Sequence, residues 1–219
     1  YQLSNYNKVV LQRNKLLKEL YLHPDYREVL DVLDMQLVQY GSALIQRRQT
    51  FAEELGEIVH RIHSQLSGGQ EEMELKYEPN VTVDAFAQML FANRERDMRL
   101  KTTATGPHRD DISFVVNGVD IRKFGSQGQQ RTAALSLKLS EIELVKRLIG
   151  DTPVLLLDDV LSELDSGRQN YLLNSIENIQ TLITCTGLDE FVNHRFSINR
   201  IYKVTDGSVT VENKQEADR

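Results

Sequence analysis

Residues 153–165 read PVLLLDDVLSELD, and this pattern points to a fold class before any other part of the chain does. The four consecutive apolar residues Val154 to Leu157 are typical of a short strand that is buried on both faces, as in a parallel sheet. Asp158 and Asp159 follow that strand directly. Because ligands in such sheets bind outside the carboxyl ends of the strands, we expect the two carboxylates to lie at a ligand site.

The residues around this stretch alternate between helix and strand patterns. A helix is expected from about Gln129 to Leu148, another from Gly167 to Glu177, and a strand from Thr181 to Thr186. The order strand, helix, strand indicates an α/β layer with a parallel core. Two small hairpins are also expected, one over 112–124 that turns at Asn117-Gly118 and one over 200–212 that turns at Asp206-Gly207.

The first hundred residues have a different, polar and helical pattern. One helix precedes a break at His23-Pro24-Asp25, where Asp25 is a candidate helix cap. A second helix is expected from Tyr26 to about Leu66, because apolar residues recur there mostly at intervals of three, four or seven. This spacing predicts an antiparallel helical arm, and a plain helical bundle fits it equally well. A strand around Leu75 and a helix from Asp84 to about Lys101 follow. We therefore expect a helical lobe over 1–104 and an α/β part over 105–219.

The composition bounds the class of protein. The chain has 219 residues, of which 40% are apolar and 26% charged, as in one large or two small domains with real cores. No apolar run reaches eighteen residues, so we expect no membrane span. The single cysteine, Cys185, cannot form an internal disulfide, which favours a cytoplasmic location. The net charge of −6 argues mildly against nucleic-acid binding, although only the contacting face must be positive.

Two glycine-containing stretches compete for a phosphate-binding role. Leu66 to Gln70 reads LSGGQ, the pentapeptide of ABC ATPases, and Ser126 to Gln130 reads SQGQQ. A phosphate site needs converging backbone N–H groups and the positive end of a following helix. LSGGQ is followed by three carboxylates within four residues on a strand pattern, so we interpret it as a turn. SQGQQ leads into a helix that has Arg131 in its first turn and no acid before Glu141.

The acids after the apolar strand suit phosphoryl chemistry. The first acid of such a strand is the usual Mg²⁺ partner, directly or through water, which assigns that role to Asp158. Asp159 could orient or deprotonate an attacking water. The following loop, Val160 to Asp165, adds further hydroxyl and carboxylate groups.

Three motifs in this order resemble the C-terminal part of the RecF family, bacterial recombination-mediator ATPases related to SMC-type and ABC-type proteins. They are GPHRDD at 106–111, FGSQGQQRTAALSLKLSEIELV at 124–145 and PVLLLDDVLSELD. The resemblance implies the C-terminal half of an ABC/SMC-like ATPase head, with an antiparallel helical arm and small β-hairpins.

The resemblance also implies a role for each matching residue. The signature loop, which would reach the γ-phosphate of ATP held by a second subunit, comprises Ser126, Gln127, Gly128, Gln129 and Gln130. Asp158 would hold Mg²⁺, and Asp159 stands where relatives place a catalytic Glu. Ser162 to Asp165 resembles the D-loop at the dimer interface. Thr186 is a possible switch residue, at a strand end where transporter relatives carry a histidine that this chain lacks.

The function implied is an ATP-dependent homodimer on DNA in recombinational repair and replication-fork maintenance, which helps to load RecA at gapped DNA with RecO and RecR. The DNA would be duplex or a single/double-strand junction. Candidate DNA contacts are the basic residues Arg94, Arg96, Arg99 and Lys101, with Lys8, Arg13, Lys15 and Lys18 as further possibilities. Ordinary solvated surface is the alternative for each. His108 and Arg109 either link arm and head or form a hydrogen-bonded corner.

One departure from the family is large. A P-loop needs GxxxxGK[ST], and no Gly-Lys pair occurs in the chain. The family carries that loop near its N-terminus, so the sequence is expected to be roughly the last three-fifths of a slow ATPase and to be inactive alone. Two other interpretations stay open, namely a transporter-type nucleotide-binding subunit and a helical scaffold with vestigial ATPase elements.

Overall fold

The computed structural model describes residues 1–20, 26–186 and 199–212, and the chain divides into two compact units, residues 1–148 and 149–219. The expected boundary at 104/105 falls inside the first unit, because a strand before it pairs with a strand after it. Within the described residues, no helix combines the length and the apolar character that crossing a membrane requires.

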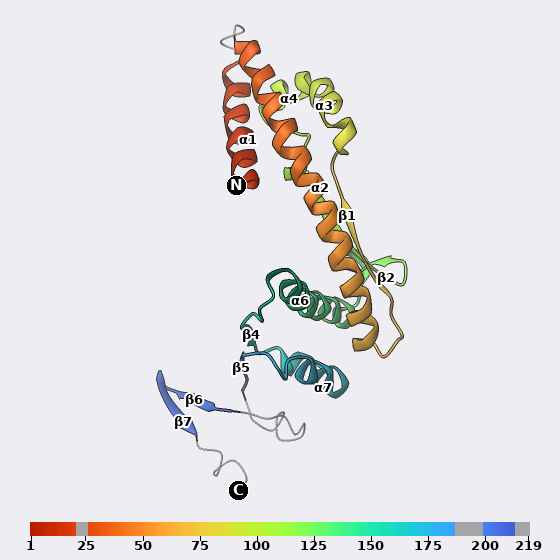
Figure 1. Cartoon of the computed structure of the whole chain (residues 1–219), viewed down its shortest axis with the longest axis vertical. Helices are drawn as coiled ribbons and strands as arrows, with labels where there is room; N and C mark the ends of the chain where they lie inside the picture. The colour runs from red at the N-terminus through yellow and green to blue at the C-terminus, as the bar shows by residue number, and fades with distance from the viewer. Residues whose placement is uncertain (21–25, 187–198, 213–219) are drawn as a thin grey trace. The chain divides into compact units, whose positions relative to one another are not determined.

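An antiparallel pair of helices forms the arm of the first unit (Figure 1). Helix α1 spans Gln2–Glu19 and helix α2 spans Arg27–Leu66, whose 40 residues confirm the long helix expected from the sequence. Apolar residues of both helices meet in one buried core that includes Leu17, Leu37 and Ile45. The proposed cap at Asp25 lies outside the described residues.

Two short helices cover the far end of the arm. The single helix expected over 84–101 is divided at Asn93 into α3, Val83–Ala92, and α4, Arg94–Leu100. Phe86 and Leu90 of α3 are buried in the arm core. Gly41 of α2 allows this close approach, because a Cβ there would lie 2.5 Å from the Phe86 ring.

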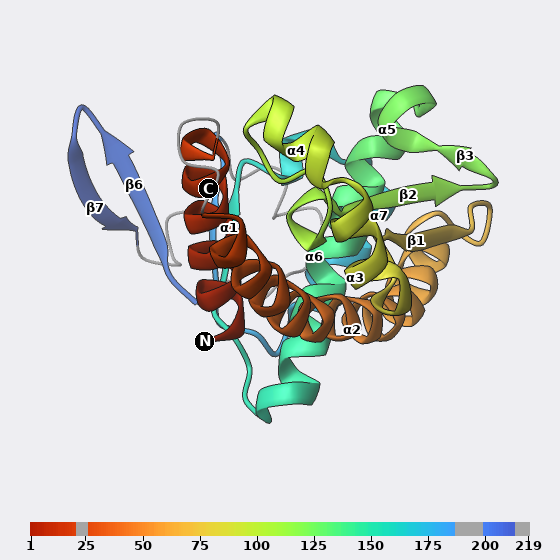
Figure 2. The same cartoon turned by 90° about the horizontal axis from the view of Figure 1, so that it is seen from above.

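A three-stranded antiparallel sheet lies beside the second half of α2 (Figure 2). Its order is β1, Met73–Glu78, then β2, Asp111–Val116, then β3, Val119–Asp120. Asn117 and Gly118 have φ values of 48° and 82°, the positive values that a tight hairpin turn needs. The second strand of this hairpin is shorter than expected, because the Asp120 carboxylate caps helix α5, Ile121–Phe124, by accepting from the Arg122 N–H at 3.0 Å.

Helix α6, Gln127–Ile149, completes the first unit and begins two residues earlier than expected. It is fastened to the end of α2 by the pair Arg61–Glu143 and by a hydrogen bond of 2.9 Å between His63 Nδ1 and Ser136 Oγ. These contacts and the pairing of β1 with β2 explain why the compact unit extends to residue 148.

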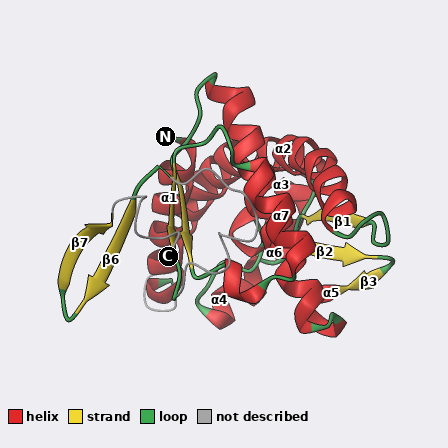
Figure 3. Cartoon of the chain, turned by 90° about the horizontal axis from the view of Figure 1, so that it is seen from below, coloured by secondary structure: helices red, strands yellow, loops and turns green. Residues whose placement is uncertain are grey.

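The second unit contains the expected strand, helix, strand order (Figure 1). Strand β4, Leu155–Asp158, pairs in parallel with β5, Thr181–Thr184, and helix α7, Ser166–Ser175, connects them after a short 3-10 turn at Leu161–Glu163. The expectation of a strand buried on both faces is corrected: Leu157 is buried, but Leu156 is 72% exposed. The second hairpin is confirmed as β6, Ile201–Thr205, paired with β7, Ser208–Glu212 (Figure 3).

Candidate functional site

The SQGQQ loop forms a reciprocal cap at the start of α6. The Ser126 hydroxyl oxygen accepts the Gln129 backbone N–H at 3.2 Å, and Gln129 Oε1 accepts the Ser126 backbone N–H at 3.1 Å. This is the capping-box arrangement, in which a serine and a residue three positions later satisfy each other's backbone donors. Helix α6 therefore begins at the expected loop, and the two reciprocal hydrogen bonds hold the backbone between Ser126 and Gln129.

The surroundings of this helix start suit an anion. Ser126, Gln127 and Gly128 are exposed, and the first turn of α6 as described contains no acid. The N-terminus of a helix carries a partial positive charge, which favours phosphate. The residues present therefore fit a phosphate of a nucleotide.

Gly128 gives a second indication. Its φ is not in the left-handed region, and among described atoms a Cβ at Gly128 would meet only Ser126 Oγ, at 4.0 Å. Neither backbone strain nor packing of the described chain requires glycine there. A glycine with open space in front of it permits close approach of a ligand or a partner to the backbone.

The LSGGQ stretch closes α2 instead of opening a helix. The N–H groups of Ser67 and Gly69 donate to the carbonyls of His63 and Ser64 at 2.9 and 2.7 Å. Gly68 and Gly69 have φ values of 64° and 79°, which explains both glycines by backbone conformation alone. The carbonyl end of a helix is negative and repels phosphate. The interpretation of this stretch as a turn is confirmed.

The turn nevertheless contacts the signature loop through Glu71. Gln129 Nε2 donates to Glu71 Oε1 at 3.0 Å, and Glu71 Oε2 lies 3.2 Å from His63 Nε2. The sequence patterns did not predict this contact. Residues 71 and 129 are far apart in the chain, and no short-range pattern relates them.

The two acids stand at the carboxyl end of β4, as expected. Asp158 is opposite Thr184 in the parallel register, and its Oδ1 accepts the Thr184 hydroxyl at 2.5 Å. The Asp159 N–H donates to Thr184 Oγ1 at 3.1 Å. The Thr184 side chain therefore joins both acids. The sequence patterns did not predict this contact, although aligning the ends of the two apolar strands would have pointed to Thr184. The switch role of Thr186 is a separate prediction.

Asp159 has an unusual backbone. Its φ of 51° lies in the left-handed region, which residues other than glycine rarely adopt, and the Ser162 hydroxyl donates to its carbonyl at 2.9 Å. Such conformations often occur at functional sites, where surrounding contacts hold them. Asp158 and Asp159 are both exposed, so their carboxylates are open to a ligand.

The donor set here fits Mg²⁺. The described residues contain no group of three or more His, Cys, Asp or Glu that could hold a metal ion. Mg²⁺ in nucleotide sites is held by one or two carboxylates together with phosphate oxygens and waters, so the exposed pair of aspartates suffices.

Asp165 and Thr186 are the remaining candidates in this unit. Asp165 caps α7, accepting the Arg168 backbone N–H at 3.0 Å and the Arg168 guanidinium at 2.9 Å. The Arg168 backbone N–H holds the pKa of Asp165 below its usual value. Thr186 is exposed. The signature loop belongs to the first compact unit and the two acids belong to the second.

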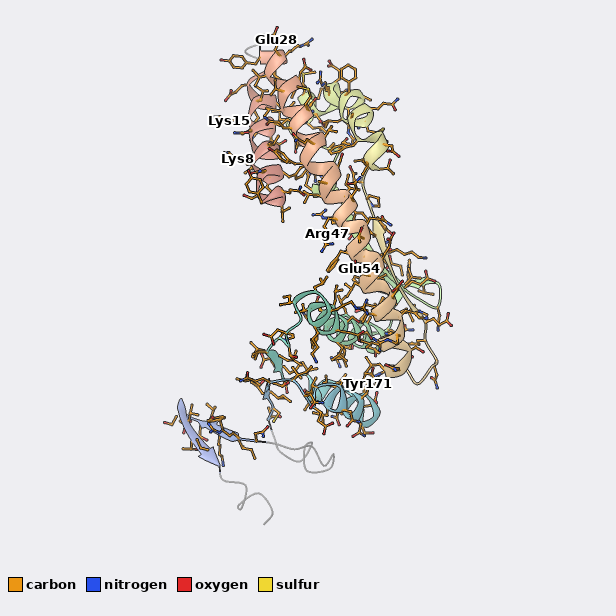
Figure 4. All side chains as sticks on the ribbon, viewed as in Figure 1. Lys8, Lys15, Glu28, Arg47, Glu54 and Tyr171 are labelled. Carbon is orange, nitrogen blue, oxygen red and sulfur yellow. The ribbon has the colours of Figure 1, made fainter. Side chains whose placement is uncertain are left out.

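Two candidate DNA contacts are paired with acids of the arm. Arg94 is committed to Asp31 and Asp34 at 2.5 and 2.7 Å, and its guanidinium lies 4.8 Å above the Phe91 ring. Arg13 is fully buried, with ion pairs of 2.6 and 2.7 Å to Asp34 and Asp97. Arg13 is therefore out of reach of a DNA phosphate, and the Arg94 side chain, which is 22% exposed, is already paired with two carboxylates. Exposed basic residues are Arg96, Arg99, Lys101, Lys18 and, on the outer side of α1, Lys8 and Lys15 (Figure 4).

GPHRDD forms a hydrogen-bonded corner of the arm. His108 Nε2 lies 2.9 Å from the Thr103 carbonyl and Nδ1 lies 2.8 Å from the Tyr6 hydroxyl, while burial lowers the pKa of His108. The ring is therefore neutral, with its proton on Nε2 and the Tyr6 hydroxyl donating to Nδ1. Asp110 accepts from Arg48 at 2.8 Å and from Tyr77 at 2.5 Å. These contacts give the motif a structural role that joins α1, α2 and β1.

Comparisons with known proteins find close relatives of the chain. The DNA replication and repair protein RecF of Lachnospira eligens is 58% identical over 96% of this chain and 59% of the relative. The proteins of the same name from Agathobacter rectalis and Clostridium acetobutylicum are 58% and 42% identical, each over 95% of this chain and 58% of the relative. No family model matches the chain.

Solved structures give the same result. Those of the recombination mediator protein RecF in the RecFOR pathway, RecF-ATP and RecF-ATPrS, match with TM-scores of 0.85 and 0.82 at 34% identity. They cover 97% and 96% of this chain and 58% and 57% of the solved chains. The likeness confirms the expected fold, an α/β part of an ABC/SMC-like ATPase head with a helical arm. The chain spans about three-fifths of the length of its relatives. It belongs to the RecF family of DNA replication and repair proteins.

Proposed function

We propose that a protein carrying this sequence is an ATP-dependent DNA clamp of recombinational repair and replication. Two copies would hold ATP between them, with the SQGQQ loop of one copy contacting the γ-phosphate bound by the other. The observation that carries this proposal is the capped start of α6, with exposed Gly128 and no acidic residue in the first turn of the helix. The match to RecF-ATP supports it.

The signature loop is organised to sense the γ-phosphate. Because the Ser126 oxygen accepts the Gln129 N–H, its own O–H is left to donate to a phosphate oxygen. Gly128 lets that phosphate approach the backbone. These contacts exist only in the ATP-bound dimer, so they favour the closed state until hydrolysis removes them.

The two acids would have different roles in ATP hydrolysis. Asp158 would hold Mg²⁺, which when bound neutralises charge on the phosphates. Asp159 would orient the attacking water and accept its proton. The Thr184 hydroxyl donates to Asp158 and accepts from the Asp159 N–H, so it holds both acids in place. We expect slow turnover by the full-length dimer and none by residues 1–219 alone, which lack a Gly-Lys pair.

DNA would be held through its phosphates by exposed basic residues, with Arg96, Arg99 and Lys101 as the remaining candidates at α4. Such binding weakens steeply with salt. RecO and RecR are the proposed partners, and loading of RecA at gapped DNA the proposed outcome. The RecF relatives favour this function over a transporter subunit or a helical scaffold.

The test uses a protein of the relatives' full length that carries this sequence. ATP should convert the wild type from monomer to dimer in sedimentation velocity, whereas Ser126→Arg should remain monomeric and bind ATP within about twofold of wild type. Asp159→Asn should still dimerise, with turnover lower by about 100-fold.

The outcomes separate the two roles. Loss of ATP binding by monomeric Ser126→Arg would contradict action of the loop on a nucleotide held by the other subunit. Failure of Asp159→Asn to dimerise would contradict its assignment as the base. A wild type that retains DNA equally with and without ATP would exclude the clamp.

A further inference from the structure

Glu71 is a carboxylate between two elements that the proposed function treats separately. It follows the turn that closes α2, and its side chain reaches the signature loop at the start of α6. We propose that Glu71 is a positioning residue, which holds the SQGQQ loop in its capped conformation and so couples the long arm helix to ATP-dependent dimerisation. This inference rests on the proposed function and assigns Glu71 no contact with nucleotide.

The first step concerns the orientation of the Gln129 amide. On one side it faces the Ser126 backbone N–H, a donor, at 3.1 Å, and on the other it faces the Glu71 carboxylate, an acceptor, at 3.0 Å. Only one amide orientation satisfies both neighbours, with Oε1 toward Ser126 and Nε2 toward Glu71. Glu71 therefore determines which way Gln129 points, and Gln129 in turn holds the backbone of Ser126.

The second step concerns the other carboxylate oxygen. Glu71 Oε2 lies 3.2 Å from Nε2 of His63, a fully buried residue of the last turns of α2. His63 Nδ1 lies 2.9 Å from Oγ of buried Ser136. The Ser136 hydroxyl also donates to the Thr132 carbonyl at 2.7 Å, so Ser136 connects the histidine to the backbone of α6.

These side-chain contacts attach α6 to the end of α2 at two positions along α6. Gln129 lies in its first turn, and Ser136 lies seven residues, or about two turns, further along. Both bonds lead back to the end of α2, one through Glu71 and the other through His63. Because α2 is a continuous helix of 40 residues, displacement of its end would reach the signature cap through these side chains.

A purely structural hydrogen bond is the alternative, and the two roles have different consequences. A structural bond contributes to stability wherever it lies. A positioning bond also determines the order of residues 126–130 and the affinity of the ATP-dependent dimer. Glu72 is the matched control, because it is the adjacent carboxylate, is exposed, and belongs to the same turn.

The first measurement needs no nucleotide. In the same full-length protein, Glu71→Ala should speed amide exchange of residues 126–130 by about tenfold, because the cap loses its support. Glu72→Ala should leave that exchange within about twofold of wild type. Glu71→Gln keeps an oxygen to accept from Gln129 and should restore most of the protection. Unchanged exchange in Glu71→Ala, or an equal rise in Glu72→Ala, would overturn the inference.

The second measurement connects the cap to dimerisation. Glu71→Ala should weaken the ATP-dependent dimer by about tenfold, a usual size for coupling between sites, while ATP binding by the monomer stays within about twofold. If the wild type dimerises and Glu71→Ala dimerises equally well, the inference fails and the proposed function stands. If the wild type itself does not dimerise with ATP, both fail. If Glu71→Ala does not fold, Glu71→Gln and Gln129→Ala decide, because only the second should lose loop protection.

Discussion

The stretches 66–70 and 126–130 both combine serine, glycine and glutamine, and they have opposite structural settings. LSGGQ lies where α2 ends, and its N–H groups are used by the carbonyls of the last helical turn. SQGQQ lies where α6 begins, capped by Ser126 and with no acidic residue in the first helical turn. The comparison shows that the helix end attached to a glycine loop, rather than the match to a motif, indicates whether the loop can receive a phosphate.

The glycines differ in the same way. Gly68 and Gly69 adopt positive φ, so the backbone of the turn requires them. Gly128 adopts ordinary helical backbone in open space, so nothing in the described fold requires it. A substitution should therefore affect stability in the first stretch and binding in the second.

Gly128→Ala should have the largest effect. We expect ATP-dependent dimerisation of the full-length protein to weaken by about tenfold or more, because a methyl group would stand where phosphate approaches the backbone. Stability should be unchanged or higher by up to about 1 kcal/mol, since alanine is the better helix former. Sedimentation with ATP and urea unfolding measure the two quantities. Dimerisation equal to wild type would remove the argument that glycine is present for a ligand.

Gly69→Ala should show the opposite pattern. Its positive φ is strained for alanine, so the free energy of unfolding should fall by about 1–2 kcal/mol. The folded protein should dimerise with ATP as the wild type does. Gly69→Asn is the control, because asparagine tolerates this conformation and should recover most of the loss. A dimerisation defect in Gly69→Ala beyond its loss of stability would show that the turn has a nucleotide role after all.

The smallest expected effect on stability concerns the glutamine that ends each stretch, Gln130 in SQGQQ and Gln70 in LSGGQ. Gln130 Nε2 donates to the Ile121 carbonyl at 2.9 Å, so Gln130→Ala should cost about 1 kcal/mol in urea unfolding. Gln70 is exposed, and Gln70→Ala should stay within about 0.5 kcal/mol of wild type. Equal losses in the two variants would mean that the Gln130 bond adds nothing to stability.

Local pattern predicted most of the elements. The 40-residue α2, strand β1, the parallel pair β4 and β5 and both hairpins were all expected, because hydrophobic periodicity and turn residues act over short distances. Boundaries differed where a polar side chain intervened, as when Asp120 ended a strand by capping α5. The helix divided at Asn93 had no comparable signal in its periodicity.

Charges were predicted less well, because a cation looks the same in sequence whether it is exposed or paired. Arg13 and Arg94 belong to one chain of alternating charges that joins Asp97, Asp34 and Asp31. Those acids come from α2 and α4, so the pairing exists only after the helices pack. The net charge of −6 gave no indication of it.

Residues near each other in the chain were enough to predict a helix start at the SQGQQ loop, two acids at a strand end and the order of strands and helices, because caps, turns and periodicity depend on neighbours. The contact of Thr184 with the two acids depends on the register in which β4 and β5 pair. The contact of Glu71 with Gln129 depends on how the end of α2 packs beside the start of α6. Such contacts join residues that only the folded backbone brings within the roughly 3 Å of a hydrogen bond. Their partners therefore cannot be read from any short stretch of the sequence.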